Sequence, residues 1–209
     1  MSSRTGADNP NPTGERIREV FRNLPTLETP RLILRRLQLE DAPDVFAYAS
    51  DPEVARYTTW SAHRSLEDSL EFVRAQLRAY EEGQVAPWAM VDRQSGRVIG
   101  TAGFVAWAPV HARAEIGYAM GRAYWGRGLM TEAVRAILRF GFEHMGLNRI
   151  EGRCMPENPA SARVMEKAGM RYEGLLREQM YIKGRFIDLK VYAMLRREWE
   201  AGAARGGAV

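Results

Sequence analysis

The residues with the clearest chemical potential are two glycines that flank an arginine, in the segment Trp125-Gly126-Arg127-Gly128. A strand-like run precedes this segment, and a helical pattern follows it. The first N–H groups of a helix lack intrahelical partners, and the helix dipole adds about half a positive charge there. Glycine lets the backbone approach an anion closely. The turn is therefore a candidate phosphate site, although a tight turn that only starts a helix would look the same.

A second group of candidate residues lies at the start of a later helix. Asn158 has the residue type of a helix N-cap, and Pro159 suits the first helical position. This structural explanation is sufficient for both residues. Ser161 follows in the first turn, and its hydroxyl can donate or accept a hydrogen bond.

Glu115 is the candidate general base. It lies in a predicted strand, where it shares one face with Gly117 and Ala119. A carboxylate in this position could accept a proton directly or through water. The alternative is a structural ion pair with Arg113 or Arg153.

The elements that must position these residues follow from periodicity and capping. Ser65 begins a capping box, and Gly83 ends the helical spacing of apolar residues behind it. Ser95-Gly96 is typical of a hairpin turn. The expected strands are 31–37, 87–91, 97–107, 113–120, 149–155, 170–178 and 186–195, and the expected helices are 40–50, 66–82, 130–145 and 159–168.

Length and composition favour one folded domain. The chain has 209 residues, of which 45% are hydrophobic and 27% are charged, as is typical of a globular protein. We expect residues 1–25 to be a disordered or appended segment with a short helix over 15–23. Residues 26–200 would form the domain, and the Gly/Ala-rich stretch 201–209 would be a flexible tail.

Charge and cysteine content argue against several functional classes. Thirty basic and 26 acidic residues leave a net charge of only +4, without the contiguous basic stripe of a nucleic-acid binder. The single cysteine, Cys154, permits no internal disulfide and fits a reducing compartment such as the cytoplasm. The three histidines show neither metal-ligand nor catalytic-triad spacing, so we expect no metal. We also expect no membrane-spanning segment.

Several segments together resemble the GNAT superfamily of N-acetyltransferases, and most closely its branch of ribosomal-protein alanine acetyltransferases. The resemblance covers nearly all of residues 26–199, in order. The segments that carry it are TPRLILRRLQLEDAPDVFAYASDPEVARY, EIGYAMGRAYWGRGLMTEA, MPENPASARVMEKAGMRYEG and IDLKVYAMLRREW.

The resemblance implies an α/β (α+β) fold with a mixed, mostly antiparallel sheet that is splayed around acetyl-coenzyme A. The wedge would lie between the strand that ends at Met120 and the strand that starts near Arg149. The expected cofactor-binding residues are the backbone of Tyr118, Ala119 and Met120 for pantetheine, Trp125, Gly126, Arg127 and Gly128 for pyrophosphate, and Asn158 and Ser161 near the acyl end.

Two positions depart from the superfamily pattern. Ala123 replaces the usual Gln or Arg at the start of the phosphate motif, so backbone amides would hold the pyrophosphate and Arg127 would contribute only charge. Met165 stands where many members have a catalytic Tyr. Ser161 is therefore the candidate for protonating the leaving thiolate, unless the thiolate simply departs.

The implied activity is direct transfer of acetyl to a primary amine in a ternary complex, by a monomer or a homodimer. A protein α-amine titrates at about 7.7 to 8.0 and so needs little base catalysis, unlike lysine at about 10.4. Small amines such as polyamines, amino acids or aminoglycosides are alternative acceptors, and a non-catalytic acyl-coenzyme A sensor is an alternative class. Candidate acceptor-site residues, each also compatible with the core, are Tyr57, Trp60, Phe104, Trp107, Met180 and Tyr181.

Overall fold

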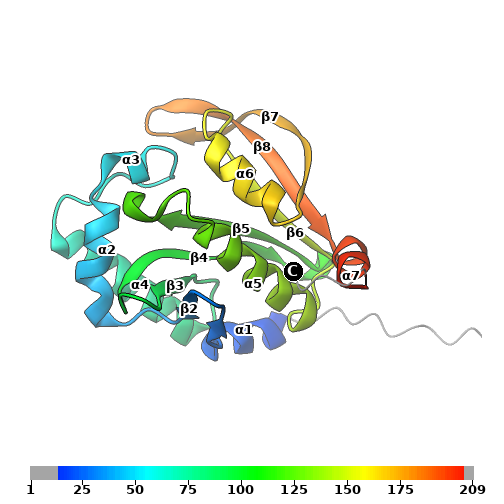
Figure 1. Cartoon of the computed structure of the whole chain (residues 1–209), viewed down its shortest axis with the longest axis horizontal. Coiled ribbons are helices and arrows are strands. Elements are labelled where there is room, and N and C mark those ends of the chain that lie inside the picture. Colours follow the sequence, from blue (N-terminus) through cyan, green and yellow to red (C-terminus); the bar gives the residue numbers. More distant parts are fainter. Residues whose placement is uncertain (1–13, 205–209) are drawn as a thin grey trace, which may run out of the picture.

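One mixed sheet of eight strands organises residues 14–204, the part of the chain that the computed structural model describes (Figure 1). The strand order is β1-β2-β3-β4-β5-β6-β8-β7. Neighbouring strands are antiparallel except β5 and β6, which are parallel. The strands are β1 (Leu27–Glu28), β2 (Leu32–Arg35), β3 (Trp88–Asp92), β4 (Val98–Ala108), β5 (Arg113–Met120), β6 (Arg149–Cys154), β7 (Arg171–Ile182) and β8 (Arg185–Leu195). The predicted mixed, mostly antiparallel sheet is confirmed.

Helices cover both faces of this sheet. On one face, α5 approaches the sheet closely at Gly141, where an added Cβ would lie 2.6 Å from Ile150, and α6 packs Met165 against Gly152. On the other face, Tyr48 of α2 contacts Thr101 of β4. The helices are α1 (Gly14–Arg22), α2 (Ala42–Ala49), α3 (Pro52–Ala55), α4 (Leu66–Glu82), α5 (Leu129–Glu143), α6 (Pro159–Lys167) and α7 (Arg196–Ala204).

Local sequence signals set the ends of two predicted helices. Helix α4 begins after Ser65, which forms the expected capping box with Asp68, and ends at Gly83 with a left-handed φ of 67°. Helix α6 begins after Asn158, whose side chain accepts a hydrogen bond from the Ser161 N–H. Both caps confirm the sequence interpretation.

The sheet divides between β5 and β6. Their parallel pairing runs from Arg113 with Arg149 to Ile116 with Gly152 and then stops. Beyond this point β5 stays paired with β4 as far as Met120, while β6 stays paired with β8 as far as Cys154. The two halves of the sheet therefore diverge at the carboxyl ends of β5 and β6, as the resemblance implied.

The two ends of the described chain pack more closely than the sequence indicated. In the amino-terminal segment, Phe21 and Leu24 are buried in the main core, and the Trp88 Nε1 donates to the Pro25 carbonyl at 2.7 Å. At the other end, α7 extends to Ala204, through the first part of the predicted tail, and Trp199 stacks on Phe142. The predictions for residues 1–13 and 205–209 fall outside the described residues.

Candidate active site

The glycine-rich loop connects β5 to α5 and has the backbone that a phosphate cradle requires. Gly126 and Gly128 have φ values of 75° and 78°, in the left-handed region, and Gly128 is the N-cap of α5. A Cβ added at Gly126 would have no heavy atom within 4 Å, so this side of the loop is open. Trp125 anchors the loop, because its Nε1 donates to the Met120 carbonyl at 2.7 Å.

This anchor engages one backbone group of the predicted pantetheine-binding strand. The carbonyl of Met120 already accepts the Trp125 indole, whereas Tyr118 and Ala119 lie on the stretch of β5 that has left β6. All three residues remain paired with β4 on their other side. Their edge toward the splay is thus the one that an extended ligand can reach.

The first turn of α6 meets β5 across the opening of the sheet. The Tyr118 hydroxyl lies 2.9 Å from the Ser161 hydroxyl and 3.2 Å from the Ser161 carbonyl. Burial raises the pKa of Tyr118 far above its ordinary value, although the contact with Ser161 opposes this, so the phenol stays protonated. Two hydroxyl groups on separate elements therefore form a proton-donating pair at the splay.

Cys154, at the end of β6, lies beside this pair. Its thiol interacts with Ser161, and burial raises the pKa of that thiol. A raised pKa disfavours the thiolate, which is the nucleophilic form. The geometry therefore gives Cys154 no activation as an acyl carrier.

Glu115 lies on the opposite face of β5 from Tyr118. Its Oε2 is 3.4 Å from the Arg153 Nε, so the ion pair considered from sequence is present with Arg153. Burial is the largest influence and raises the pKa of Glu115; nearby Glu151 raises it further, and Arg153 and Arg113 partly offset both. A half-buried carboxylate of raised pKa fits both a structural partner and a proton acceptor.

A group of charges surrounds Glu115 on this face of the sheet. Glu151 is buried, and its carboxylate lies 3.3 Å from Arg113, 3.4 Å from Arg149 and 3.8 Å from Arg153. Three guanidinium groups thus neutralise one buried carboxylate. Arg113, the other partner considered for Glu115, instead forms its ion pair with Glu151.

The aromatic residues considered for the acceptor site divide into three environments. Phe104 is 1% exposed and packs edge-on against Trp88, so its predicted place at the wedge mouth is wrong. Successive side chains of a strand point to opposite faces of the sheet, and the side chain of Phe104 lies on the face that α5 covers. Trp60 and Trp107 pack against the main core. Met180 and Tyr181 are exposed on β7.

Tyr57 has a different setting, because it closes a small second cluster of apolar side chains. It packs against Met155, which follows β6, and against residues of β7 and β8, which are Ile182, Ile187 and Leu189. The Lys183 ammonium donates to the Ala55 carbonyl at 2.6 Å, so the β7–β8 hairpin also touches α3. These contacts join α3 and Tyr57 to the β7–β8 hairpin and to the residue that follows β6.

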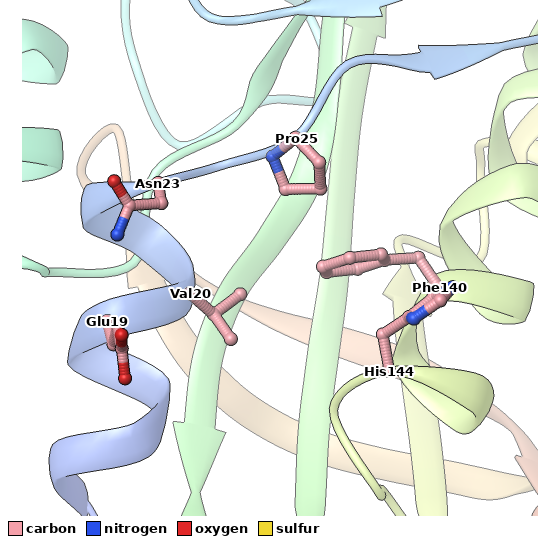
Figure 2. Close-up of a pocket in the computed structure, with 6 residues that line it drawn as sticks. All are labelled: Glu19, Val20, Asn23, Pro25, Phe140 and His144. Carbon is pink, nitrogen blue, oxygen red and sulfur yellow. The ribbon is translucent and has the colours of Figure 1, made fainter.

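A hollow lies elsewhere on the molecule, between α1 and the carboxyl end of α5 (Figure 2). It has a volume of about 340 Å³, and its polar side chains are Glu19, Asn23 and His144. The loop is at the other end of α5, roughly 20 Å away along a helix of this length. A hollow whose only formal charge is the Glu19 carboxylate does not fit a polyanionic ligand.

Residues 14–204 hold no group of three or more His, Cys, Asp or Glu side chains arranged to bind a metal ion. Within the same residues, no helix has both the length and the apolar composition to cross a membrane. His63, one of the three histidines, bonds Ser69 at 2.7 Å and is structural.

The geometry agrees with comparisons to known proteins. A family model described as the acetyltransferase (GNAT) domain matches residues 31–171. The chain belongs to the GNAT acetyltransferase family. GNAT acetyltransferases use acetyl-coenzyme A as the donor and an amine as the acceptor. The glycine-rich loop and the splayed strands are therefore the candidate places for these two substrates.

The relatives of this GNAT acetyltransferase include several bacterial proteins. The "Uncharacterized N-acetyltransferase p20" of Bacillus licheniformis is 37% identical over 174 residues, which are 83% of this chain and 98% of that protein. The [ribosomal protein uS5]-alanine N-acetyltransferase of Escherichia coli is 28% identical over 125 residues, or 59% of this chain and 64% of that enzyme. A solved GNAT acetyltransferase from Bacillus anthracis is 30% identical, with a TM-score of 0.74, and covers 83% of this chain and 99% of its own.

Sequence reasoning missed three residues that lie behind the glycine-rich loop. Thr29, Arg31 and Glu132 form a hydrogen-bonded group that reaches the Arg127 carbonyl. From the sequence, Arg31 lies in the expected strand 31–37, Glu132 lies in the expected helix 130–145, and all three residues lie in segments that carry the resemblance. The sequence did offer a signal for this group. Glu132 is a charged residue in the first turn of a helix that starts at a glycine, and Arg31 is an arginine at the end of a strand.

Proposed function

We propose that this protein transfers the acetyl group of acetyl-coenzyme A to a primary amine, and that the amine is the α-amino group of a protein amino terminus. The observation that carries the proposal is the splay after Ile116 and Gly152, which has Glu115 on one face and the Tyr118–Ser161 pair on the other. Transfer needs a proton acceptor on the side of the amine and a proton donor on the side of the sulfur.

The donor fits the residues along the opening. The backbone amides at Gly126, Gly128 and the first turn of α5 would hold the pyrophosphate, with charge from Arg127 at the rim. The exposed edge of Tyr118 and Ala119 would pair with the pantetheine amides. Asn158 and Ser161, at the start of α6, would lie next to the thioester.

The acetyl transfer itself needs two proton movements. The neutral amine attacks the thioester carbonyl carbon and forms the C–N bond, and its proton passes to Glu115, directly or through one water. The tetrahedral intermediate then collapses and the C–S bond breaks. Ser161 donates its hydroxyl proton to the departing thiolate and takes one from the Tyr118 hydroxyl. The raised pKa of Tyr118 keeps it protonated before the transfer and draws a proton back from solvent afterwards, while Glu115 releases the amine proton to solvent.

Three points support an α-amine as the acceptor. An α-amino group titrates at about 7.7 to 8.0, so a substantial fraction is already neutral and the partly paired Glu115 suffices as the base. The alanine N-acetyltransferase of Escherichia coli, a relative at 28% identity, carries this specificity in its name. Exposed Tyr181 and Phe186 on the β7–β8 hairpin offer apolar surface to a peptide.

The test is release of free thiol from acetyl-coenzyme A with a panel of acceptors. The panel holds peptides that begin with Ala, Ser or Met, the same peptides with a blocked amino terminus and a free lysine, and polyamines, amino acids and aminoglycosides. We expect turnover with the free amino termini and none with the blocked peptides. Faster turnover of a small amine would overturn the acceptor class, and binding of coenzyme A without turnover of any amine would indicate a sensor.

A further inference from the structure

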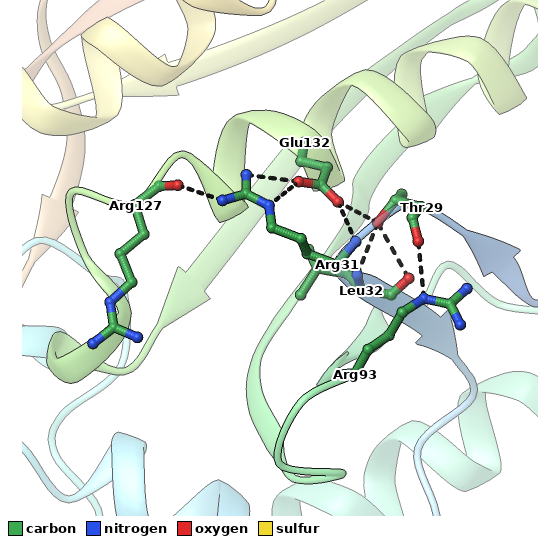
Figure 3. A network of polar contacts seen from close by, with 6 residues as sticks. All are labelled: Thr29, Arg31, Leu32, Arg93, Arg127 and Glu132. Atoms are coloured by element: carbon green, nitrogen blue, oxygen red, sulfur yellow. Dashed lines mark hydrogen bonds and ion pairs between the residues drawn. The ribbon is translucent and has the colours of Figure 1, made fainter.

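A hydrogen-bonded group of three side chains lies directly behind the glycine-rich loop (Figure 3). Glu132, in the first turn of α5, is its centre. One carboxylate oxygen accepts from the Thr29 hydroxyl at 2.6 Å and from the Arg31 N–H at 2.8 Å, and the other accepts from the Arg31 Nε at 2.7 Å. Helix α5 is thereby tied to the entrance of β2, more than 100 residues away in the sequence.

Arg31 extends this group to the loop itself. Its Nη1 donates to the Arg127 carbonyl at 2.8 Å. The peptide between Arg127 and Gly128 is trans and planar, so its C=O and N–H groups point in opposite directions. Because Arg31 holds the carbonyl toward β2, the Gly128 N–H is turned away from β2, and the strand order puts β5 and β6, where the sheet opens, to one side of β2.

The same contacts control charge beside the loop. Burial alone would raise the pKa of Glu132, but the hydrogen bonds from Thr29 and Arg31 outweigh it and hold that pKa below the ordinary value. Glu132 is therefore an anion near the start of α5, where it would repel a polyphosphate. The Arg31 guanidinium neutralises it, while the side chain of Arg127 points away from the group and lies over Tyr124 (Figure 3).

The group rests on a firm part of the sheet. Thr29 forms a closed turn in which its hydroxyl accepts from the Leu32 N–H at 2.9 Å. The Arg93 Nε donates to the Thr29 carbonyl at 2.9 Å, and the Arg93 N–H donates to the Arg31 carbonyl at 3.0 Å. The backbone of Arg31, whose side chain orients the loop, is thus held by the backbone N–H of Arg93, and the Arg93 side chain braces the turn at Thr29.

We propose that Arg31, Glu132 and Thr29 are positioning residues that aim the loop amides at a diphosphate. The inference rests on the proposed use of the loop for the pyrophosphate of coenzyme A. These residues should raise the affinity for ligands that carry the diphosphate, and they should leave the affinity for ligands that end at pantetheine unchanged.

The test compares the affinities of coenzyme A and pantetheine by isothermal titration calorimetry. We expect Arg31→Gln to weaken coenzyme A binding by about tenfold or more, as for loss of one hydrogen bond to a charged group. Pantetheine binding should stay within about twofold, inside the usual scatter for a surface change. Arg74→Gln is the matched control, since Arg74 pairs at 2.7 Å with Glu67 in the first turn of α4 and is similarly exposed.

Two further variants separate orientation from charge and from misfolding. Arg31→Lys keeps the charge but loses the planar fork, so it should bind coenzyme A almost as weakly as Arg31→Gln. Thr29→Val removes one hydroxyl at nearly constant volume and should cause a smaller loss that is again confined to coenzyme A.

The outcomes distinguish the positioning role from the proposed function. Full affinity in Arg31→Lys would reduce the role of Arg31 to charge, and an equal loss of both ligands in Arg31→Gln and Thr29→Val would show general structural damage. Either result overturns the proposal, as does unchanged coenzyme A binding in Arg31→Gln. If the unaltered protein binds neither ligand, the coenzyme A site itself fails, and the positioning role falls with it.

Discussion

Replacement of Gly126 by alanine tests the phosphate cradle, because this glycine has a close structural counterpart far from the loop. Gly126 has a φ of 75°, and Gly96, in the turn between β3 and β4, has a φ of 70°. A Cβ added at either position would have no heavy atom within 4 Å. The variants Gly126→Ala and Gly96→Ala therefore introduce nearly the same backbone strain without a clash.

The size of that strain follows from the left-handed conformation. An L-residue in this region costs roughly 1–2 kcal/mol. For a protein of about 200 residues, each kcal/mol lowers the melting temperature by about 2–4 °C. Both variants should therefore melt about 2–8 °C below the unaltered protein when no ligand is present.

The two variants should differ in their response to coenzyme A. A ligand at 100 times its Kd stabilises a protein by about 2.7 kcal/mol, and a tenfold loss of affinity leaves about 1.4 kcal/mol. The methyl group of Gly126→Ala enters the open side of the loop and disturbs amides that would bind phosphate. We expect about half of the coenzyme A-induced rise in melting temperature to disappear in Gly126→Ala.

The assay is thermal unfolding of each variant with and without coenzyme A, each compared with its own unliganded value. Gly96→Ala should retain the full ligand-induced rise. An equal rise in Gly126→Ala and Gly96→Ala would show that the loop does not hold the pyrophosphate. If millimolar coenzyme A did not raise the melting temperature of the unaltered protein, the assignment of a coenzyme A site would be refuted.

Three further predictions concern catalysis and packing. Glu115→Gln should lower kcat/KM by about 100-fold and make the acid limb shallower, because both Glu115 and the acceptor amine must lose a proton in the unaltered protein and only the amine must do so in the variant; an unchanged pH profile would exclude Glu115 as the base. Ser161→Ala should lower kcat by about tenfold, less than usual for a general acid because a thiolate is a stable leaving group, without changing the Kd of acetyl-coenzyme A; parallel losses would limit Ser161 to binding. Phe21→Ala should cost about 3–5 kcal/mol in urea unfolding, since this fully buried ring fixes α1 to the core; a loss below about 1 kcal/mol would mean that α1 contributes little to the domain.

Local features of the fold were predictable because they depend on a few neighbouring residues. The Ser65 capping box, the Asn158 N-cap and the left-handed end at Gly83 each follow from side-chain and backbone preferences within one turn. The alternation in β5 likewise separates Glu115 from Tyr118. The predicted strand 170–178 was too short, since β7 extends to Ile182 through irregular pairing with β8, which only the partner strand supports.

By itself, the sequence determined the glycine-started helix, the capped helix at Asn158 and, through resemblance, the GNAT family. Only the tertiary structure decided that Arg31 reaches Glu132 and the loop, that Tyr118 meets Ser161, and that Phe104 is core rather than acceptor site. These contacts join segments that are distant in the sequence, so they depend on strand order and on which face each element covers. Hydrophobic periodicity predicts that a residue is buried, but it does not predict which residues of other elements it packs against.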